Sequence, residues 1–471
     1  MREFGRKQLA RLSMLAAVAA LAACTAGPDY RRPPVEVPSS YKEDSGSWRP
    51  AAPRDDIDRG PWWAIYRDPI LDGLEREVDV SNQNLKAAEA AYREASAAVA
   101  EDRAGLFPHV TVGASAGHMN GTMPRPTLPN SLYGTATWAP DVWGRIRREV
   151  ERDTAEAAAS GADLASARLS MQAVLATDYF ELRAEDEAAR LLQLTASSER
   201  TGLQIAQRQY DTGTGDLADV LAAQSQLEDV EARALNVGVR RTRLEHAIAV
   251  LIGKPPAEFS LKAAPYRDEM PGVPPGVPSA LLERRPDIAA AERRMAAANA
   301  EIGIATAAWY PDLTLSVSSG YAGMVLSQLL QASNRFWAIG PELTEAAFDA
   351  GARKARVSRA RAAYDRSVAQ YRETVLTAFQ QIEDNLAALR ILTEQRKVQE
   401  ASVRHAQAAE QLALAQYASG LAPYSRALAA RSARLADEDA LLAVRRERLA
   451  ASVALIEALG GGWKAAGAPA G

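Results

Sequence analysis

The stretch from Glu149 to Tyr210 limits the fold of this chain more than any other feature, because it predicts one uninterrupted helix. Ala, Leu, Glu, Arg and Gln dominate the stretch, and no proline interrupts it. About 60 residues at ~1.5 Å each span roughly 90 Å, which is more than one globular core needs. The glycine-containing run 211–215 then ends the helix. Apolar residues recur three and four apart, which predicts a narrow seam against other long helices. They are Leu164, Leu169, Val174, Leu175, Leu182, Leu191, Leu194, Leu203 and Ile205.

The same pattern occurs a second time in the chain. Tyr210 and the residues after it are matched by Tyr417 and the residues after it, at a spacing of 207 residues. Earlier in each copy, Phe107-Pro108 matches Tyr310-Pro311 at a spacing of 203. The chain is therefore a tandem duplication with a small length difference in one loop. Each copy is predicted to contain a helix, two strands, a very long helix (149–210 and 353–417) and a return helix.

Two segments in each copy alternate between apolar and small polar residues, as a strand with one apolar face does. In the first copy they are 110–117 and 133–143, and Pro140 must lie near the end of the second. In the second copy they are 313–318 and 336–348. Aromatic residues gather near the strand ends, which fits either a membrane-interface girdle or the caps of an ordinary small sheet. They are Phe107, Trp138, Trp143, Trp309, Tyr310, Phe336 and Trp337.

The N-terminus is typical of an exported protein. Four basic residues precede a short apolar run from Leu12 to Ala23, which is a signal peptide and is too short to span a membrane. Cys24 is the only cysteine, and it could be a small apolar filler. Because it directly follows Leu-Ala-Ala, it resembles the lipidated cysteine of bacterial lipoproteins. Thr25, rather than an aspartate, follows it, so this resemblance implies the outer membrane.

The sequence offers no catalytic constellation. Its four histidines are scattered, no second cysteine is available for zinc, and the net charge of −4 does not favour a nucleic-acid partner. Gly213-Thr214-Gly215 begins a run that matches a dinucleotide fingerprint by letter, but a helix rather than a strand precedes it. We therefore expect a protein that is not an enzyme and that has no cofactor or metal.

The four strands also constrain the assembly. The smallest membrane barrels have about eight strands. An open sheet edge cannot face lipid, because its amides would lack hydrogen-bond partners. If these strands are transmembrane, several chains must share one barrel.

These motifs together resemble the TolC-like outer-membrane efflux proteins, in the OprM/NodT lipoprotein branch. The resemblance extends from the signal peptide to Trp463. The motifs that carry it are Leu21-Ala22-Ala23-Cys24, Pro28-Asp29-Tyr30, Trp62-Trp63, Asp68-Pro69, Asp141-Val142-Trp143-Gly144-Arg145, Tyr210-Asp211-Thr212-Gly213, Arg284-Arg285-Pro286-Asp287-Ile288, Ala291-Glu292-Arg293-Arg294, Tyr310-Pro311-Asp312 and Gly460-Gly461-Gly462-Trp463.

The resemblance implies a mostly α member of the α+β class that works as a homotrimer. Long coiled helices would form a periplasmic α-barrel, and four strands per chain would enter a shared transmembrane β-barrel of about 12 strands. The trimer would be the passive exit duct of a tripartite efflux pump, exporting drugs or other small molecules. Its partners would be a periplasmic adaptor protein, an RND-type inner-membrane transporter and outer-membrane lipid.

The resemblance also places the gate of the duct at the periplasmic helix tips. These tips map to 213–220 and 420–428. OprM-like members narrow the second tip with an acidic residue and a leucine, where this chain has Ala429 and Ser425. We therefore expect a gate made by Asp216, Asp219 and Arg426, with Tyr424 as a plug. The alternative is that these residues only cap helices and turns, with Asp216 as an N-cap.

The alternative function is a lipid-anchored periplasmic coiled-coil scaffold or adaptor. It would explain the helices and Cys24, but it leaves the two strand pairs unexplained. In either case we expect six segments along the chain. They are a signal peptide (1–23), a lipidated extended segment (24–61), the first repeat (62–254), a proline-rich linker (255–280), the second repeat (281–463) and a disordered tail (464–471).

Overall fold

The computed structural model describes residues 25–34, 42, 61–117, 130–267, 270 and 285–461. The expectations for the signal peptide, Cys24, most of the extended segment 24–61, most of the proline-rich linker and the C-terminal tail therefore lie outside the described residues.

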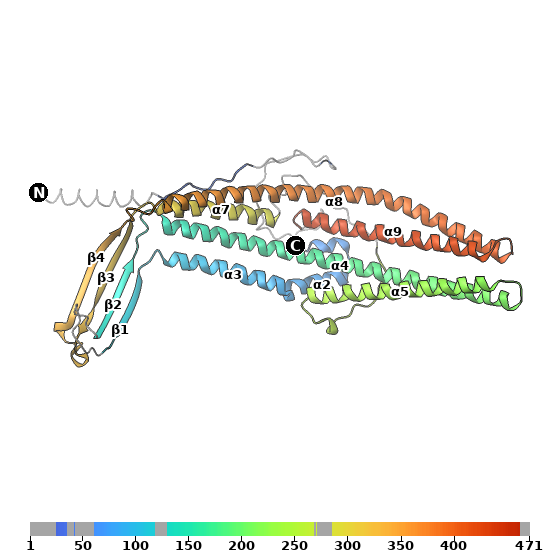
Figure 1. The fold of residues 1–471 in the computed structure, drawn as a ribbon, viewed down its shortest axis with the longest axis horizontal. Helices are drawn as coiled ribbons and strands as arrows, with labels where there is room; N and C mark the ends of the chain where they lie inside the picture. Colours follow the sequence, from blue (N-terminus) through green and yellow to red (C-terminus); the bar gives the residue numbers. More distant parts are fainter. Residues whose placement is uncertain are drawn as a thin grey trace, which may run out of the picture. The chain divides into compact units, whose positions relative to one another are not determined.

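The helices confirm the duplication (Figure 1). In the first copy α3 spans Gln83–Ala104, α4 spans Arg145–Asp211 and α5 spans Leu217–Leu251. In the second copy α7 spans Pro286–Ala307, α8 spans Ala352–Ala418 and α9 spans Tyr424–Ala458. The members of each pair have equal lengths: 22 residues for α3 and α7, 67 for α4 and α8, and 35 for α5 and α9. The first residues of α3 and α7 are 203 apart, and those of the other two pairs are 207 apart. These are the two spacings read from the sequence.

The remaining helical elements are short. A 3-10 helix η1 (Trp62–Tyr66) and helix α2 (Pro69–Ser81) precede α3, and Asp68 caps α2 by accepting from the backbone N–H groups of Ile70 and Leu71. The described connections contain three further 3-10 turns: η2 (Pro256–Glu258), η4 (Leu326–Gln328) and η5 (Ala332–Asn334). No described helix combines the length and the apolar composition that crossing a bilayer requires.

The chain forms two compact units that do not follow the repeats. Unit 1 contains Met1–Val35, Glu89–Ala162 and Ile288–Thr374, and unit 2 contains Glu36–Ala88, Asp163–Asp287 and Val375–Gly471. Each unit takes segments from both copies, since α4 and α8 contribute to both.

Unit 1 contains an antiparallel sheet in the order β1-β2-β3-β4. The strands are β1 (His109–Ser115), β2 (Asn130–Trp138), β3 (Asp312–Gly323) and β4 (Arg335–Thr344). The four expected strands are therefore confirmed, although β2 ends at Trp138, before Pro140, and β4 ends four residues before Phe348.

The register gives the sheet one apolar and one polar face. Val110 is opposite Ala136, Ala136 is opposite Val317, and Val317 is opposite Ile339, so apolar residues share a face through all four strands. The other face carries mostly small and polar residues such as Thr111, Thr135 and Ser318, together with the aromatic residues Tyr133 and Phe336. Several large residues of the sheet are exposed in the single chain: Val110, Val112, Leu132, Trp138, Val317, Trp337, Ile339 and Leu343. A sheet of this kind needs an apolar environment on one side only.

The helical part of unit 1 follows the order of the strands. Arg152 of α4 forms ion pairs with Asp102 of α3 and with Glu301 of α7. Ala360 of α8 packs in one cluster with Ile302 and Ala305 of α7. The neighbours are therefore α3–α4, α4–α7 and α7–α8, so α3 and α8 are the two outer helices of this unit (Figure 1).

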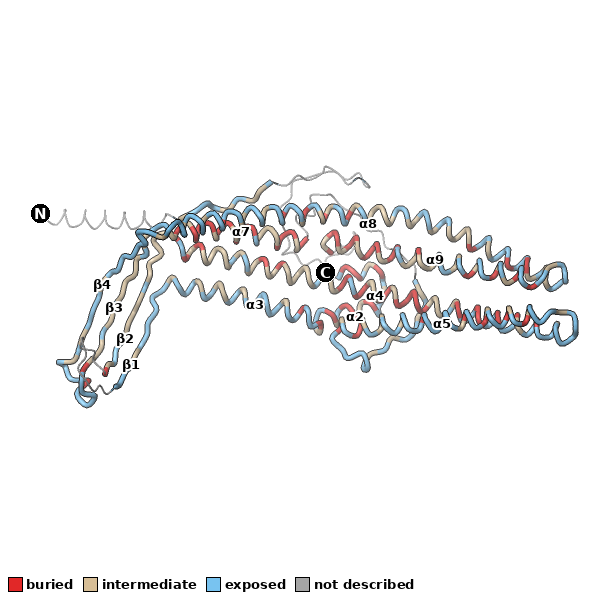
Figure 2. Tube along the Cα trace, in the orientation of Figure 1, coloured by how far each residue is buried: buried red, intermediate tan, exposed pale blue. Residues whose placement is uncertain are grey.

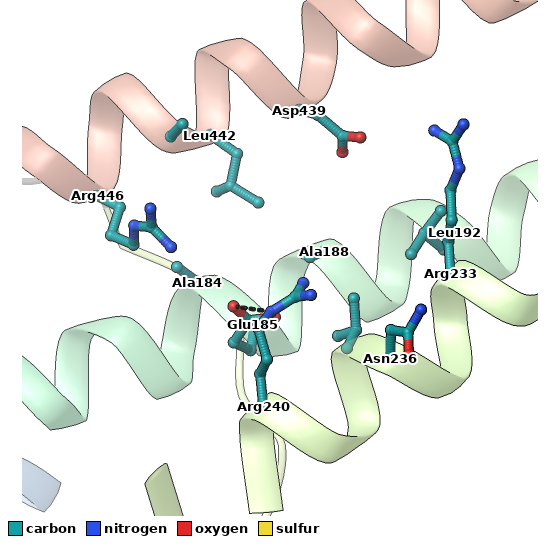
Figure 3. Close-up of a pocket in the computed structure, with 12 residues that line it drawn as sticks. Ala184, Glu185, Ala188, Leu192, Arg233, Asn236, Arg240, Asp439, Leu442 and Arg446 are labelled. Atoms are coloured by element: carbon teal, nitrogen blue, oxygen red, sulfur yellow. Dashed lines mark hydrogen bonds and ion pairs between the residues drawn. The ribbon is translucent and has the colours of Figure 1, made fainter. Parts of the chain in front are cut away.

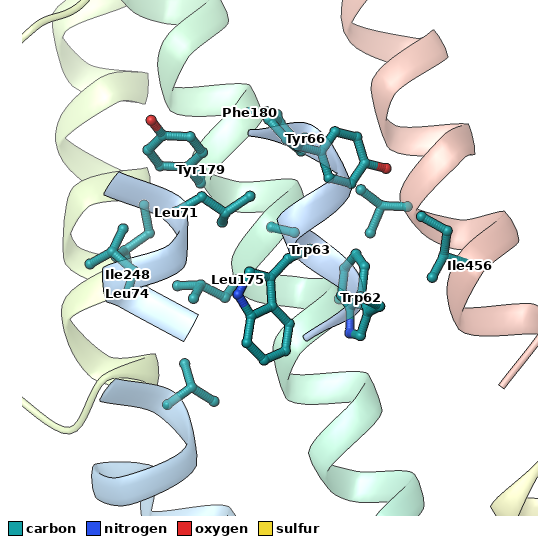
Figure 4. Close-up of a cluster of buried hydrophobic side chains, with 14 of the residues drawn as sticks. Trp62, Trp63, Tyr66, Leu71, Leu74, Leu175, Tyr179, Phe180, Ile248 and Ile456 are labelled. Atoms are coloured by element: carbon teal, nitrogen blue, oxygen red, sulfur yellow. The ribbon is translucent and has the colours of Figure 1, made fainter. Parts of the chain in front are cut away.

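The core of unit 2 is built around the short element η1. Trp62, Trp63 and Tyr66 are buried against α2, α4, α5 and α9, as Figure 4 shows for the labelled side chains. The Trp62 indole donates to Gln172, and the Tyr66 hydroxyl shares a hydrogen bond of 2.7 Å with Ser452. These polar contacts satisfy the polar groups of large aromatic residues in an apolar core.

The seam predicted for the first long helix is only partly confirmed. Leu175 and Leu182 are fully buried, but Val174, Leu194 and Ile205 are 41%, 58% and 37% exposed. A helix of this length has different neighbours along its course, so one stripe cannot face a single partner throughout.

Candidate functional site

The first hairpin tip is a tight turn between α4 and α5. Gly213 has φ +70°, a left-handed conformation that favours glycine at a helix C-terminus, and the N–H groups of Thr214 and Gly215 donate to the carbonyl of Gln209. Asp216 is the N-cap of α5, and its carboxylate accepts from the Ala218 N–H at 3.1 Å. Asp219 lies in the first turn of α5, where a negative charge is favourable. The N-cap expected for Asp216 is therefore present.

The second tip has the same backbone but different side chains. Gly420 has φ +73°, and its N–H donates to the carbonyl of Tyr417. Pro423 stands at the N-cap of α9 and provides no side-chain hydrogen bond, and the first turn has no acidic residue. Arg426 is exposed there, without an ion pair to any other described residue. Its positive charge lies near the positive end of the helix dipole and is available to a partner.

The two tips contact each other through a small apolar cluster. Ala206, Val220 and Ala223 come from the first hairpin, and Ala413, Tyr424 and Ala427 come from the second. The Tyr417 hydroxyl donates to the side-chain oxygen of Gln209 across the same contact. Burial raises the pKa of Tyr417, and the nearby Asp219 carboxylate adds to this rise. The structure thus brings Asp219 close to the junction of the hairpins, while Asp216 and Arg426 remain on the surface.

The position of Tyr424 differs from the expected plug. Its side chain is only 2% exposed, and its ring lies 5.1 Å from the ring of Tyr417. Its hydroxyl lies beside Gly202, only 2.8 Å from the place where a Cβ atom of that residue would be. A plug must project from the tip, whereas Tyr424 is packed inside it. The plug expectation therefore does not fit this structure.

A buried ion network lies next to Tyr424, and sequence analysis missed it. Arg431 of α9 donates to Glu410 of α8 at 2.8 Å and to Glu199 of α4 at 2.9 Å. Arg434 bridges Glu410 and Glu438 at 2.5 Å each. Glu199 is fully buried, and burial raises the pKa of its carboxyl while Arg431 opposes this rise. The partners are distant in sequence, so no local pattern could have indicated the network.

A separate cavity of about 330 Å³ lies between α4, α5 and α9 (Figure 3). Its lining includes Leu192 and Leu442 together with charges of both signs, and Arg240 donates to Glu185 at 2.9 Å. The cavity is thus amphipathic rather than apolar. The described residues contain no cluster of His, Cys, Asp and Glu side chains that could hold a metal ion.

Comparisons with known proteins give one consistent result. The family model described as outer membrane efflux protein matches residues 76–254 and 277–461. The toluene efflux pump outer membrane protein TtgF of Pseudomonas putida is 28% identical over 462 residues, covering 94% of this chain and 95% of that protein. The outer membrane protein OprJ of Pseudomonas aeruginosa is 29% identical over 483 residues, covering 97% of each chain.

Solved structures give the same result. The outer-membrane channel OprN aligns with a TM-score of 0.83 and 32% identity, covering 93% of this chain and 100% of that chain. The open state of the MtrE outer membrane channel of Neisseria gonorrhoeae aligns with a TM-score of 0.77 and 25% identity, covering 93% and 98%. These relatives are channels and outer-membrane pump proteins, so the comparisons favour the duct over the scaffold.

Proposed function

The chain belongs to the outer membrane efflux protein family, and we propose that three copies of it form the exit duct of a tripartite efflux pump. It is an outer-membrane channel component with a helical part and a smaller β part. The observation that carries the proposal is the similarity to efflux channels over nearly the whole chain. The duct would be passive, with transport energy supplied by an inner-membrane transporter reached through a periplasmic adaptor.

The sheet supports a duct that is shared between copies. Its apolar face matches lipid and its polar face matches a water-filled interior. Within the described residues, β1 and β4 each pair on one side only, so both edges are open. Open edges cannot face lipid, and one chain has too few strands for a barrel of about eight. Three copies would supply about twelve strands and would pair every edge.

The segment after Cys24 supports a lipid anchor at that residue. The Ala26 N–H donates to the backbone carbonyl of Trp143 at 3.0 Å. The ring of Trp143 stacks on the ring of Tyr310, with 4.7 Å between the ring centroids. Arg148 donates to the carbonyl of Ala26 and to the carboxylate of Asp29. These contacts hold the segment that follows Cys24 at the junction between the sheet and the helices of unit 1. We propose that Cys24 is lipidated and that its acyl chains enter the bilayer at this level.

We further propose that the hairpin tips are the gate, with Asp216, Asp219 and Arg426 at the aperture. The apolar tip cluster and the ion pair between Glu199 and Arg431 support this assignment, since both join α4 to α9 close to the tips. A change in the position of one hairpin would have to separate these contacts. Tyr424 would then be a packing element of the closed tip.

Conductance of the purified trimer in planar bilayers tests the gate. Replacing Asp216 and Asp219 with Ala should raise ion leakage, because the aperture loses two charges per chain. Replacing both with Asn keeps a residue that can cap a helix and removes only the charge. If Asn leaks as much as Ala, the charge closes the aperture. If the Ala variant leaks and the Asn variant does not, the two residues act only as helix caps. If the conductance of both variants equals that of the wild type, the two residues are not part of the gate.

A further inference from the structure

The two outer helices of unit 1 carry the same spacing pattern with opposite charges. In α3 the pattern is Ala90, Glu94, Ala97, Glu101 and Ala104. In α8 it is Ala355, Arg359, Ala362, Arg366 and Ala369. Both series alternate steps of four and three residues, which places all five members on one stripe of a helix.

Both stripes are exposed in the single chain. All ten residues are in the exposed class, and Figure 2 draws α3 largely as exposed. Glu94, Glu101, Arg359 and Arg366 form no ion pair or side-chain hydrogen bond with another residue in the described part of the chain. By contrast, Asp102 on the inner side of α3 pairs with Arg152 of α4. The stripes therefore point away from the neighbouring helices of unit 1.

The positions of the stripes indicate what could cover them. α3 leads into β1 and α8 follows β4, so the stripes lie on the same two sides as the open sheet edges. α4 and α7 stand between α3 and α8, as Figure 1 shows. The two stripes thus cannot meet within one chain. In a ring of copies that closes the sheet, α8 of one copy becomes the neighbour of α3 of the next.

The register of such a contact can be read from the spacings. α3 runs toward the sheet and α8 runs away from it, so the two helices would be antiparallel. If Ala97 is placed opposite Ala362, the outer alanines of the two series also oppose each other. Glu101 then lies opposite Arg359 and Glu94 opposite Arg366, each within about one residue rise of ~1.5 Å.

We propose that these stripes are the subunit seam, in which α8 of one copy packs on α3 of the next through alanines flanked by Glu–Arg pairs. The proposal rests on the proposed function, which requires copies to share one duct, and it names the residues that select the neighbour. Alanines let two helix backbones approach closely, and charges beside a seam set partner choice and orientation. An α8–α8 contact would oppose arginines, and an α3–α3 contact would oppose glutamates. The charges therefore exclude two-fold pairing and favour a head-to-tail ring.

The native mass of the full-length chain, purified in detergent, tests the seam. Wild type should have the mass of three chains. The E94R/E101R variant and the R359E/R366E variant each oppose like charges, and each should fall about threefold in mass, to the single chain. A variant with all four substitutions restores opposite charges and should regain the wild-type mass. Circular dichroism should show wild-type helix content in all three variants.

The K354E/R361E variant is a matched control. Lys354 and Arg361 lie on the same part of α8, are exposed and are also seven residues apart, but they lie off the alanine stripe. This variant should keep the wild-type mass. If the two double variants stay trimeric, or if the quadruple variant stays monomeric, the proposed seam is wrong. Either result would leave the proposed duct unaffected. A monomeric wild type would instead contradict the proposed function itself.

Discussion

Gly202 lies within α4, where a glycine normally weakens a helix, and its role is to leave space for Tyr424. A Cβ atom at this position would lie 2.8 Å from the buried Tyr424 hydroxyl. We therefore expect Gly202→Ala to destabilise the protein by about 1–3 kcal/mol, the usual cost of overpacking. Tyr424→Phe removes the oxygen that causes the clash, and this hydroxyl has no hydrogen-bond partner among the described residues. The double variant should therefore recover most of the loss in thermal unfolding. A double variant no more stable than Gly202→Ala would contradict this packing.

Glu75 of α2 makes stability depend on pH. It is fully buried, and its two carboxyl oxygens have no hydrogen-bond partner among the described residues. Burial, with the nearby Asp79 and Asp72, raises the pKa of its carboxyl from 4.5 to about 9. Between these values the folded chain holds a proton that the unfolded chain has released. The free energy of unfolding should therefore fall as pH rises, by about 1.4 kcal/mol per unit.

Replacing Glu75 with Gln should remove this dependence, because the amide does not titrate. Chemical unfolding at several pH values between about 5 and 9 measures it. Glu77→Gln on the same helix is the control, since the Glu77 side chain is 43% exposed and pairs with Lys254. A Glu75→Gln variant with the wild-type slope would show that another group is responsible.

Among the larger elements, the N-terminal segment 25–34 depends on one buried arginine. The Arg148 side chain is 4% exposed, and it contacts Asp29, Glu151 and the carbonyls of Ala26 and Gly27. Replacing Arg148 with Ala should therefore release the segment. Hydrogen exchange at the Ala26 amide should speed up by roughly tenfold or more, since its bond to Trp143 loses support. Arg145→Ala, about one turn earlier and 46% exposed, should leave this exchange unchanged. Equal exchange in both variants would contradict the role of Arg148.

The elements also show what could be predicted from the sequence. Helix composition and the repeat spacings placed α4 and α8 within a few residues, because a long helix is determined by local preference and a glycine stop. The alternation of apolar and polar residues located the four strands, because this pattern is also local in the sequence. The N-cap, which was the alternative interpretation of Asp216, is present, whereas its place in the gate stays a prediction.

Contacts between distant segments could not be predicted in this way. Tyr424 was expected to be a plug, yet its side chain is buried beside Gly202 of another helix. The ion network of Glu199, Glu410 and Arg431 has no local signature, since its members come from three helices. Each of these features depends on which helices pack together, which periodicity alone does not determine.

For the whole molecule, we propose that one chain is an incomplete channel. The sheet has one apolar face and two open edges, and α3 and α8 carry complementary charges on the corresponding sides. These features have no partner within the described part of a single chain. Three copies would satisfy them together, which explains why exposed apolar residues persist on the strands.

The most direct test is the native mass of the wild-type protein, extracted with detergent from the outer-membrane fraction. We expect a particle of about three processed chains that leaves the membrane only with detergent. A single chain released without detergent would mean that the strands never enter lipid, and it would contradict the shared duct.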